Sequence, residues 1–517
     1  MKINLTAIAF SLIFILGLAR NSSAELLYSN DISYLGSFSV PNMGSSPQTT
    51  HYGGTAIGYN PDGNGGLGSL FINGFANAGT YIGELSIPAA LYTGNDVSTV
   101  SQAPYIASML GSSPYFWDIS NSHYSFVGAG GVSVGCENGW GVGGLWVDSP
   151  ANRLYATSYC YYGMAHNALP IITHGTNLAG STYAGNYGLN LGSTYNWFEG
   201  QTGDLNSGAI AAIPAEYQSQ LGGKILIGAN PHNMSIVTRT SFGPALTAVN
   251  PDLFTTANTQ VPGYSLSCYP AGHMTLGVWG ELANDYISQA DAQSAIAFPA
   301  GSQSVLVVGK HGVGGPGTVC PGMATSGIGC YGMSTDLCSE VCLNNPPAGS
   351  GIPQCTGAFT SCGGLGRGTE NCCYNPPGAH QGGHSNTAWP YRTYVWAYDV
   401  GDAQGNNTAG NNVQSMSAVH PQRNNLTAVK LGYLNPWDLY PYATWQLSAD
   451  PFNEAANLGS SGYISGGTYD PESGKLYTTL YQGVRSQRTS IIEVWQVSQG
   501  VSSDTTAPVA PAGLVVR

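Results

Sequence analysis

The segment GGTYDPESGKLYTTLY, Gly466–Tyr481, carries the pattern that decides the fold. Two glycines precede a short apolar stretch, an Asp-Pro pair opens a polar turn, and a second apolar stretch follows. The same pattern occurs in GGTAIGYNPDGNGGLGSLF (Gly53–Phe71) and in GGLWVDSPANRLY (Gly143–Tyr155). An Asn or Asp side chain can hydrogen-bond its own backbone to start a turn, and Pro fixes φ beside it. Each segment therefore predicts a strand, a tight turn and a second strand.

Weaker copies occur at Gly208–Asn230 and Ala295–Gly312. Hairpin repeats spaced by tens of residues are typical of a β-propeller, in which paired glycines let the innermost strands approach closely around the axis. Four-stranded blades of roughly 40–60 residues favour seven blades here, with six or eight as alternatives. The strand predicted at Ile32–Pro41 would complete the last blade and close the ring. A pair of β-sandwiches is the alternative fold.

The composition supports an all-β chain. It contains 32 Tyr and 72 Gly among 517 residues, and short runs of Val, Ile and Thr alternate with turn residues. Helix is predicted only at Pro214–Leu221 and Asn284–Ala297.

The N-terminus predicts export. Lys2 is followed by an apolar run at Ala7–Ala19, which is too short to span a bilayer, and small residues precede a cleavage point after Ala24. We therefore expect a signal peptide over residues 1–24 and a secreted protein, extracellular, periplasmic or at the cell surface, without membrane insertion. The propeller domain is expected over residues 25–502. Residues 503–517 are expected to be a linker or the truncated start of a β-sandwich module.

Charge narrows the class of partner. Charged residues make up only 8% of the chain and the formal net charge is −13. A chain without a basic patch is a poor partner for nucleic acid. The negative net charge and the small number of Lys and Arg residues also argue against an anionic polymer as substrate.

Cysteines concentrate in one segment. Eight of the 11 lie in a Gly/Pro-rich insertion at about residues 313–390, which cannot form a hydrophobic core and is expected to be held by disulfides. These eight are Cys320, Cys330, Cys338, Cys342, Cys355, Cys362, Cys372 and Cys373. Cys136 and Cys160 are expected to pair with each other, and Cys268 is either free or joined to the insertion. Zinc binding by the insertion is the alternative.

Catalytic signals are weak, and the sequence leaves open whether the chain is an enzyme. A Gly-Val-Ser-Val-Gly match at Gly131–Gly135 resembles a nucleophile elbow but lacks the helix that this motif requires. The histidines are scattered, although a propeller can bring distant residues together at its axial mouth. The catalytic candidates are His51, His123, His166, His273, Glu137 and Glu281. A polysaccharide lyase would need a base near a sugar carbon, and a hydrolase would need paired carboxylates.

Aromatic clusters are the stronger signal for binding, because Tyr and Trp can stack on sugar rings. The candidates are Tyr195, Trp197, Trp437, Tyr440 and Tyr442. No cofactor is expected. Calcium is an alternative because Asn60–Gly66 and Asp399–Asn407 cluster oxygen-bearing side chains, although both segments also fit ordinary turns.

The segments YGGTAIGYNP, PAEYQSQLGG, YRTYVWAYD, PWDLYPYATWQL and SGGTYDPESGKLY together resemble a group of uncharacterised exported bacterial β-propeller-type proteins. The tail DTTAPVAPAGLVV resembles the start of a fibronectin type III-like module. This resemblance implies a fold but no activity. The leading interpretation is an exported module that binds extracellular or cell-surface glycans or proteins. The alternatives are a carbohydrate-active enzyme with its site at the axial mouth, and a structural surface-layer or adhesion protein.

Overall fold

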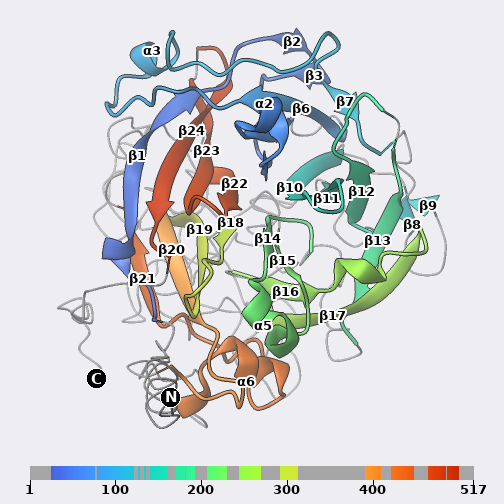
Figure 1. Ribbon diagram of the computed structural model, residues 1–517, viewed down its shortest axis with the longest axis vertical. Helices are drawn as coiled ribbons and strands as arrows, with labels where there is room; N and C mark the ends of the chain where they lie inside the picture. The colour runs from blue at the N-terminus through green and yellow to red at the C-terminus, as the bar shows by residue number, and fades with distance from the viewer. Residues whose placement is uncertain are drawn as a thin grey trace, which may run out of the picture.

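Strands dominate the computed structural model of this chain (Figure 1), so the protein is all-β. The structure describes residues 25–75, 79–120, 126–127, 133–134, 140–160, 169–180, 182–192, 206–229, 244–268, 292–312, 391–408, 421–447, 464–484 and 486–499. The expected signal peptide, the cysteine-rich insertion and the C-terminal tail all lie outside these residues.

The main strands form five antiparallel units of four strands. Unit 1 contains β4 (Ile57–Asn60), β5 (Ser69–Asn73), β6 (Tyr81–Ser86) and β7 (Trp117–Asp118). Unit 2 contains β10 (Trp140–Asp148), β11 (Arg153–Cys160), β12 (Ile171–Gly175) and β13 (Gly185–Asn190). Unit 3 contains β14 (Ile210–Ala212), β15 (Ile225–Gly228), β16 (Leu246–Val249) and β17 (Thr259–Ser267). Unit 4 contains β18 (Ala292–Ala297), β19 (Ser304–Gly312), β20 (Tyr391–Asp399) and β21 (Ala443–Gln446). Unit 5 contains β22 (Ile464–Asp470), β23 (Lys475–Val484), β24 (Thr489–Val497) and β1 (Ile32–Ser39).

The remaining described elements are short. Two small hairpins pair β2 (Gly44–Ser45) with β3 (Gln48–Thr49) and β8 (Phe126–Val127) with β9 (Ser133–Val134). The α-helices are α2 (Gly63–Gly66), α3 (Val97–Val100), α5 (Ala215–Leu221) and α6 (Leu426–Lys430). The 3-10 helices are η1 (Ser29–Asp31), η4 (Pro251–Leu253) and η7 (Pro421–Arg423).

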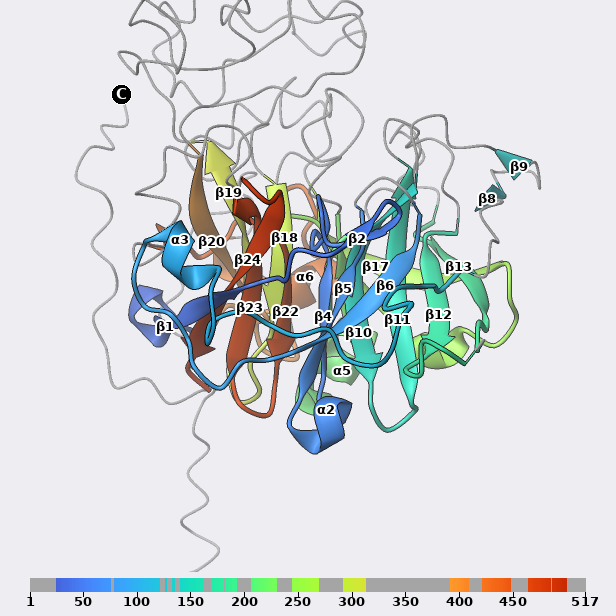
Figure 2. The same cartoon turned by 90° about the horizontal axis from the view of Figure 1, so that it is seen from above.

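The inner strands β4, β10, β14, β18 and β22 surround a common centre, and each contacts the next around the ring (Figures 1 and 2). All five hairpins predicted from the repeats are the inner hairpins of these units. The N-terminal strand closes the ring as predicted, because β1 pairs antiparallel with β24 of unit 5.

The core is divided among the junctions between units. One apolar cluster lies between each successive pair of units, for example Phe71 and Ile82 of unit 1 against Leu145 and Leu154 of unit 2. The other four junctions are filled in the same way. Burial of apolar side chains between neighbouring sheets therefore holds the ring together.

Units 2 and 3 are also joined at their outer edges. Strand β13 pairs in parallel with β17 from Tyr187–Thr259 to Asn190–Pro262, which makes one eight-stranded sheet. Its two end strands, β10 and β14, contact each other, so this sheet curves until it is nearly closed.

The paired glycines have the role that the sequence predicted. A Cβ on Gly466 would lie 2.5 Å from the carbonyl oxygen of Thr55, at the start of unit 1. A Cβ on Gly467 would lie 2.3 Å from the Cβ of Ala295, in unit 4. Unit 5 can therefore approach both neighbours only because these two residues lack side chains.

Two predictions need correction. The described residues contain five four-stranded units, not the seven that the length estimate favoured. Long connections such as residues 87–116 and 400–442 occupy chain that the estimate assigned to further blades. The predicted helix at Asn284–Ala297 is wrong over Ala292–Ala297, which form β18, because pairing with β19 decides the structure of this short apolar run. Helix α5 confirms the prediction at Pro214–Leu221.

Candidate functional site

The antiparallel order of each unit separates two faces of the ring. Turns between the first and second strands, such as residues 61–68, 149–152 and 471–474, lie at one end of the sheets, which we call the turn face. Connections from the second to the third strand, and from the fourth strand to the next unit, begin and end at the opposite end. We call this end the connection face (Figure 2).

The catalytic candidates belong to segments that begin and end at the connection face. His51 lies between β1 and β4, and residues 123 and 137 lie between β7 and β10. Residue 166 lies between β11 and β12, and residues 273 and 281 lie between β17 and β18. The aromatic candidates at 195 and 197 lie between β13 and β14. Of this whole group only His51 is among the described residues, so His123, His166, His273, Glu137, Glu281, Tyr195 and Trp197 are assigned by their connections alone.

His51 is half-buried and held by local contacts. Its Nε2 is in hydrogen-bond contact with Oδ1 of the exposed Asn42, and its backbone N–H donates to Oγ1 of Thr49 over 3.1 Å. These contacts fix the imidazole at the connection face.

Beside His51 lies an aromatic and cationic cluster that the sequence did not reveal. The ring centroids of Tyr52 and Phe75 are 5.5 Å apart, and Cζ of Arg488 lies 5.2 Å from the centroid of the Tyr52 ring. Tyr52 and Phe75 are half-buried and Arg488 is exposed. The cluster joins the first and last units, so no local sequence signal could have identified it.

Buried amide and hydroxyl groups lie close to this cluster in the sequence. Asn73 accepts a hydrogen bond from the N–H of Ala56 over 2.9 Å and donates one to Oγ1 of Thr55 over 2.8 Å. The buried hydroxyl oxygens of Thr479 and Thr489 have no hydrogen-bond partner among the described residues.

Three of the aromatic candidates serve packing. Trp437, Tyr440 and Tyr442 are each 8% exposed, so their rings present almost no surface on which a sugar could stack. The Tyr442 hydroxyl is in hydrogen-bond contact with Oγ of Ser304 at 2.7 Å and with the carbonyl oxygen of Leu27. Burial raises the pKa of Tyr442 well above its usual range. As placed, these side chains support unit 4 and its outer connection and do not form a binding platform.

Cys268 is free and buried at the end of β17. Burial raises the pKa of its thiol to about 12, an effect that a hydrogen bond from Ser265 partly offsets. The thiolate needed for reaction is therefore suppressed. Cys160 lies in β11, Cys136 lies outside the described residues, and so do the eight cysteines of the insertion. The expected disulfides stay predictions.

Of the two segments considered for calcium, Asn60–Gly66 contains a turn and the short helix α2, and Asp399–Asn407 forms turns. Asp399 accepts hydrogen bonds from the N–H of Gly401 and of Thr408, and Asp402 accepts them from Gln404 and Asn406. The pKa of Asp402 is lowered, because these hydrogen bonds together outweigh the opposing effect of burial. In the described part of the chain, no group of three or more His, Cys, Asp or Glu side chains is placed to hold a metal ion.

The serine of the nucleophile-elbow match also lacks the required setting. Ser133 lies in β9, which pairs with β8 as a two-stranded hairpin, whereas an elbow places its serine between a strand and a helix. Among the described residues, no helix is long and apolar enough to span a membrane.

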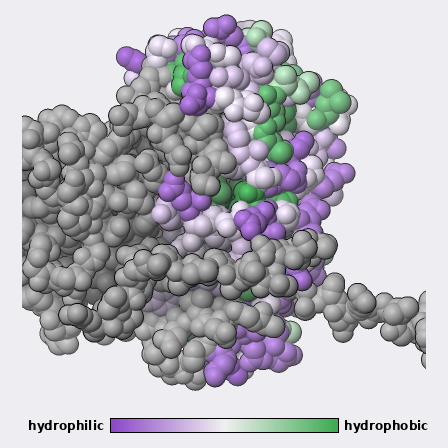
Figure 3. Space-filling view, turned by 90° about the vertical axis from the view of Figure 1, so that its left-hand side faces the viewer, coloured by the Kyte–Doolittle hydropathy of each residue, from purple (hydrophilic) through white to green (hydrophobic). Residues whose placement is uncertain are grey.

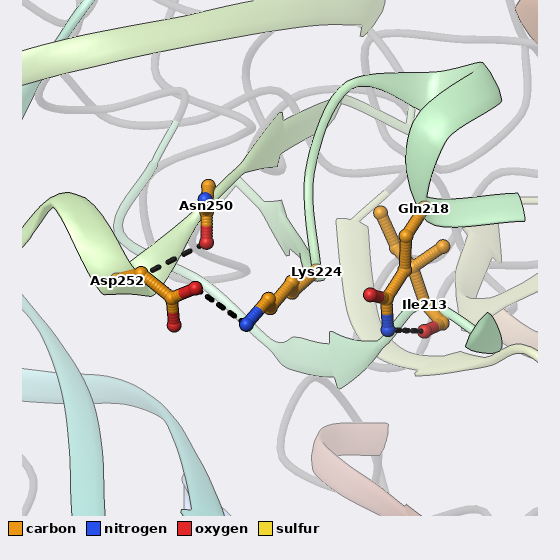
Figure 4. A network of polar contacts seen from close by, with 5 residues as sticks. All are labelled: Ile213, Gln218, Lys224, Asn250 and Asp252. Carbon is orange, nitrogen blue, oxygen red and sulfur yellow. Dashed lines mark hydrogen bonds and ion pairs between the residues drawn. The ribbon is translucent and has the colours of Figure 1, made fainter.

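Lys224 and Asp252 form a salt bridge, with Nζ and Oδ2 2.5 Å apart on the surface of unit 3 (Figure 4). Oδ1 of Asn250 accepts a hydrogen bond from the N–H of Asp252 and so fixes the same turn. The described surface seen in Figure 3 mixes hydrophilic and weakly polar residues with small hydrophobic areas.

Comparisons with known proteins identify no relative for this chain. No protein-family model matches it, and no curated protein matches it. Two solved chains are similar at 10% and 11% identity, with TM-scores of 0.26 and 0.25, and each match covers 91% of this chain and 99% of the other. Their structures are described as apo ctPRC2 in an autoinhibited state and as a humanized mutant of the Chaetomium thermophilum Polycomb Repressive Complex 2 bound to an inhibitor. Likeness at this level supports no argument about fold or function.

Proposed function

We propose that this chain is an exported five-bladed β-propeller that binds extracellular or cell-surface glycans through its connection face. The five four-stranded units, the inner strands in mutual contact and the closure of unit 5 by β1 support the propeller assignment. We infer export from the N-terminal segment. The resemblance of the sequence to uncharacterised exported bacterial β-propeller-type proteins agrees with this proposal.

One observation carries the functional part of the proposal. The aromatic pair at 195 and 197 and all the scattered histidine candidates belong to connections that begin and end at a single face. The other face carries the tight turns between the first and second strands, such as residues 149–152 and 471–474, and the connections between the third and fourth strands, of which residues 87–116 and 400–442 are long. A scaffold with varied connections on one side is a common way for a rigid fold to present binding residues.

A glycan array probed with the purified full-length protein tests this proposal. We expect binding to a defined set of glycans, and we expect Tyr195→Ala and Trp197→Ala to weaken it at least tenfold. Tyr433→Ala is the matched control, because Tyr433 is 47% exposed and lies after α6, in the β20–β21 connection, which starts and ends at the turn face. The absence of any glycan binding would contradict the proposal and favour a protein-binding or structural role.

A carbohydrate-active enzyme is the second candidate. It is favoured by the fact that His51 and the connections containing residues 123, 137, 166, 273 and 281 share one face. Incubating the protein with glycans that it binds, and measuring new reducing ends and unsaturated products, tests this candidate. Product formation that is lost in His51→Ala would support an enzyme. Binding without product formation would support a binding module.

A further inference from the structure

Tyr52 and Arg488 share a rare backbone conformation. Five non-glycine residues in the described part of the chain have positive φ, and three of them are asparagines, which tolerate this region. The other two are Tyr52, at φ 54°, and Arg488, at φ 57°. The N–H of Tyr52 donates to the carbonyl oxygen of Arg488 over 2.9 Å, so the two strained residues are direct partners.

Such strain has a cost and commonly marks a functional site. Here the two residues lie with Phe75 at the junction of the first and last units. The centroid of the Tyr52 ring lies 5.5 Å from that of Phe75 and 5.2 Å from Cζ of the Arg488 guanidinium. His51 and the exposed Asn42 lie next to the cluster and add polar groups.

No carboxylate among the described residues neutralises the positive charge of Arg488. Within the described residues no carboxylate lies within salt-bridge distance of its guanidinium, although the chain carries 27 Asp and Glu against 14 Lys and Arg. A guanidinium keeps its N–H groups in one plane, and it binds carboxylates through two parallel hydrogen bonds. An exposed guanidinium of this kind is suited to an anionic ligand.

We propose that Tyr52, Phe75 and Arg488 form a subsite for one hexuronate residue within an otherwise neutral glycan. This inference rests on the proposed glycan-binding function. The aromatic rings contact the apolar side of the sugar ring, and the guanidinium binds its carboxylate. The net charge of −13 opposes a polyanion, but salt screens distant charges beyond about 8 Å, so a single carboxylate responds mainly to Arg488.

Isothermal titration calorimetry on the full-length protein tests the subsite with three probes. These are aldotetraouronic acid (three xyloses carrying one glucuronate), its methyl ester, and neutral xylotetraose. We expect the acid to bind at least tenfold more tightly than the ester or the neutral sugar. Arg488→Ala should remove this preference, and Arg488→Lys should restore only part of it.

The protein contains a matched control. Arg423 lies 3.8 Å from the centroid of the exposed Tyr433 ring, so Arg423→Ala removes the same kind of cation–aromatic contact at another surface. We expect this variant to keep the preference. Tyr52→Gly should also lose the preference for the acid. Its melting temperature should fall by no more than that of Tyr433→Ala, because glycine adopts a positive φ without strain.

Equal binding of all three probes, or equal effects of Arg488→Ala and Arg423→Ala, would overturn the subsite. If the array detects neutral glycans and the acid shows no advantage, the proposed function stands and this inference fails. If no glycan binds in either experiment, both fail.

Discussion

Oγ of Ser490 donates a hydrogen bond of 2.8 Å to the carbonyl oxygen of Gly53, although 437 residues separate the two in the chain. Ser490 lies in β24 of unit 5, and Gly53 comes just before β4 of unit 1. Equivalent side-chain bonds join other units, such as Oγ1 of Thr157 to the carbonyl oxygen of Gly208 over 2.7 Å. The closing junction therefore uses the same chemistry as the rest of the ring.

We expect Ser490→Ala to lower the free energy of unfolding by about 1–3 kcal/mol, because the substitution removes a buried hydrogen bond and leaves one partner unsatisfied. Urea denaturation followed by tryptophan fluorescence measures this loss. Ser101→Ala is the control, since its hydroxyl makes an exposed bond to the carbonyl of Ser98. If both variants lose the same stability, the Ser490 bond has no special role at the junction.

The paired glycines of β22 give a second prediction. Gly466→Ala and Gly467→Ala should each lower the free energy of unfolding by about 1–3 kcal/mol or more, because each Cβ would clash with a neighbouring unit. Thermal unfolding by circular dichroism reports the change. Gly180→Ala is the comparison, because its Cβ would approach Nδ2 of the Asn177 side chain at 3.1 Å and no other described atom more closely than 3.5 Å. Wild-type stability in either β22 variant would show that the inner strands are less crowded than described.

The scaffold could be predicted from the sequence because its signals are local. Each inner hairpin carries its own strand residues and turn, and Asp470 starts its turn by accepting the N–H of Glu472, as predicted. The number of units could not be derived, since connection lengths are not encoded in the repeat. The Tyr52–Arg488 contact was also missed, because it exists only after the ring closes. Burial of Tyr442 likewise depends on Leu27 and Ser304, which are remote in sequence.

Cys268 should resist modification in the folded protein. Its thiol is fully buried with a pKa raised to about 12, so at pH 8 almost none of it is the reactive thiolate. Iodoacetamide labelling followed by peptide mass spectrometry should find Cys268 unmodified under native conditions and modified in denaturant. Rapid native labelling would instead mean that the end of β17 opens readily.

Alkaline pH should destabilise the fold through its buried tyrosines. Burial, reinforced by the Asp470 carboxylate and a hydrogen bond to it, raises the pKa of Tyr59 from 10.0 to about 12. The unfolded chain therefore loses this proton first as the pH rises, so stability present below pH 10 is lost progressively towards pH 12. Tyr155, Tyr217 and Tyr469 are shifted in the same direction, also to about 12.

Tyr59→Phe isolates one of these contributions. Phenylalanine cannot ionise, so the variant should lose less stability between pH 9 and pH 11.5 than the wild-type protein, even if its stability at pH 7 is lower through loss of the contact with Asp470. Urea denaturation across this pH range, with tyrosinate absorbance at 295 nm as a second signal, measures the difference. Identical pH profiles for Tyr59→Phe and the wild-type protein would mean that the Tyr59 hydroxyl does not oppose ionisation in the folded state.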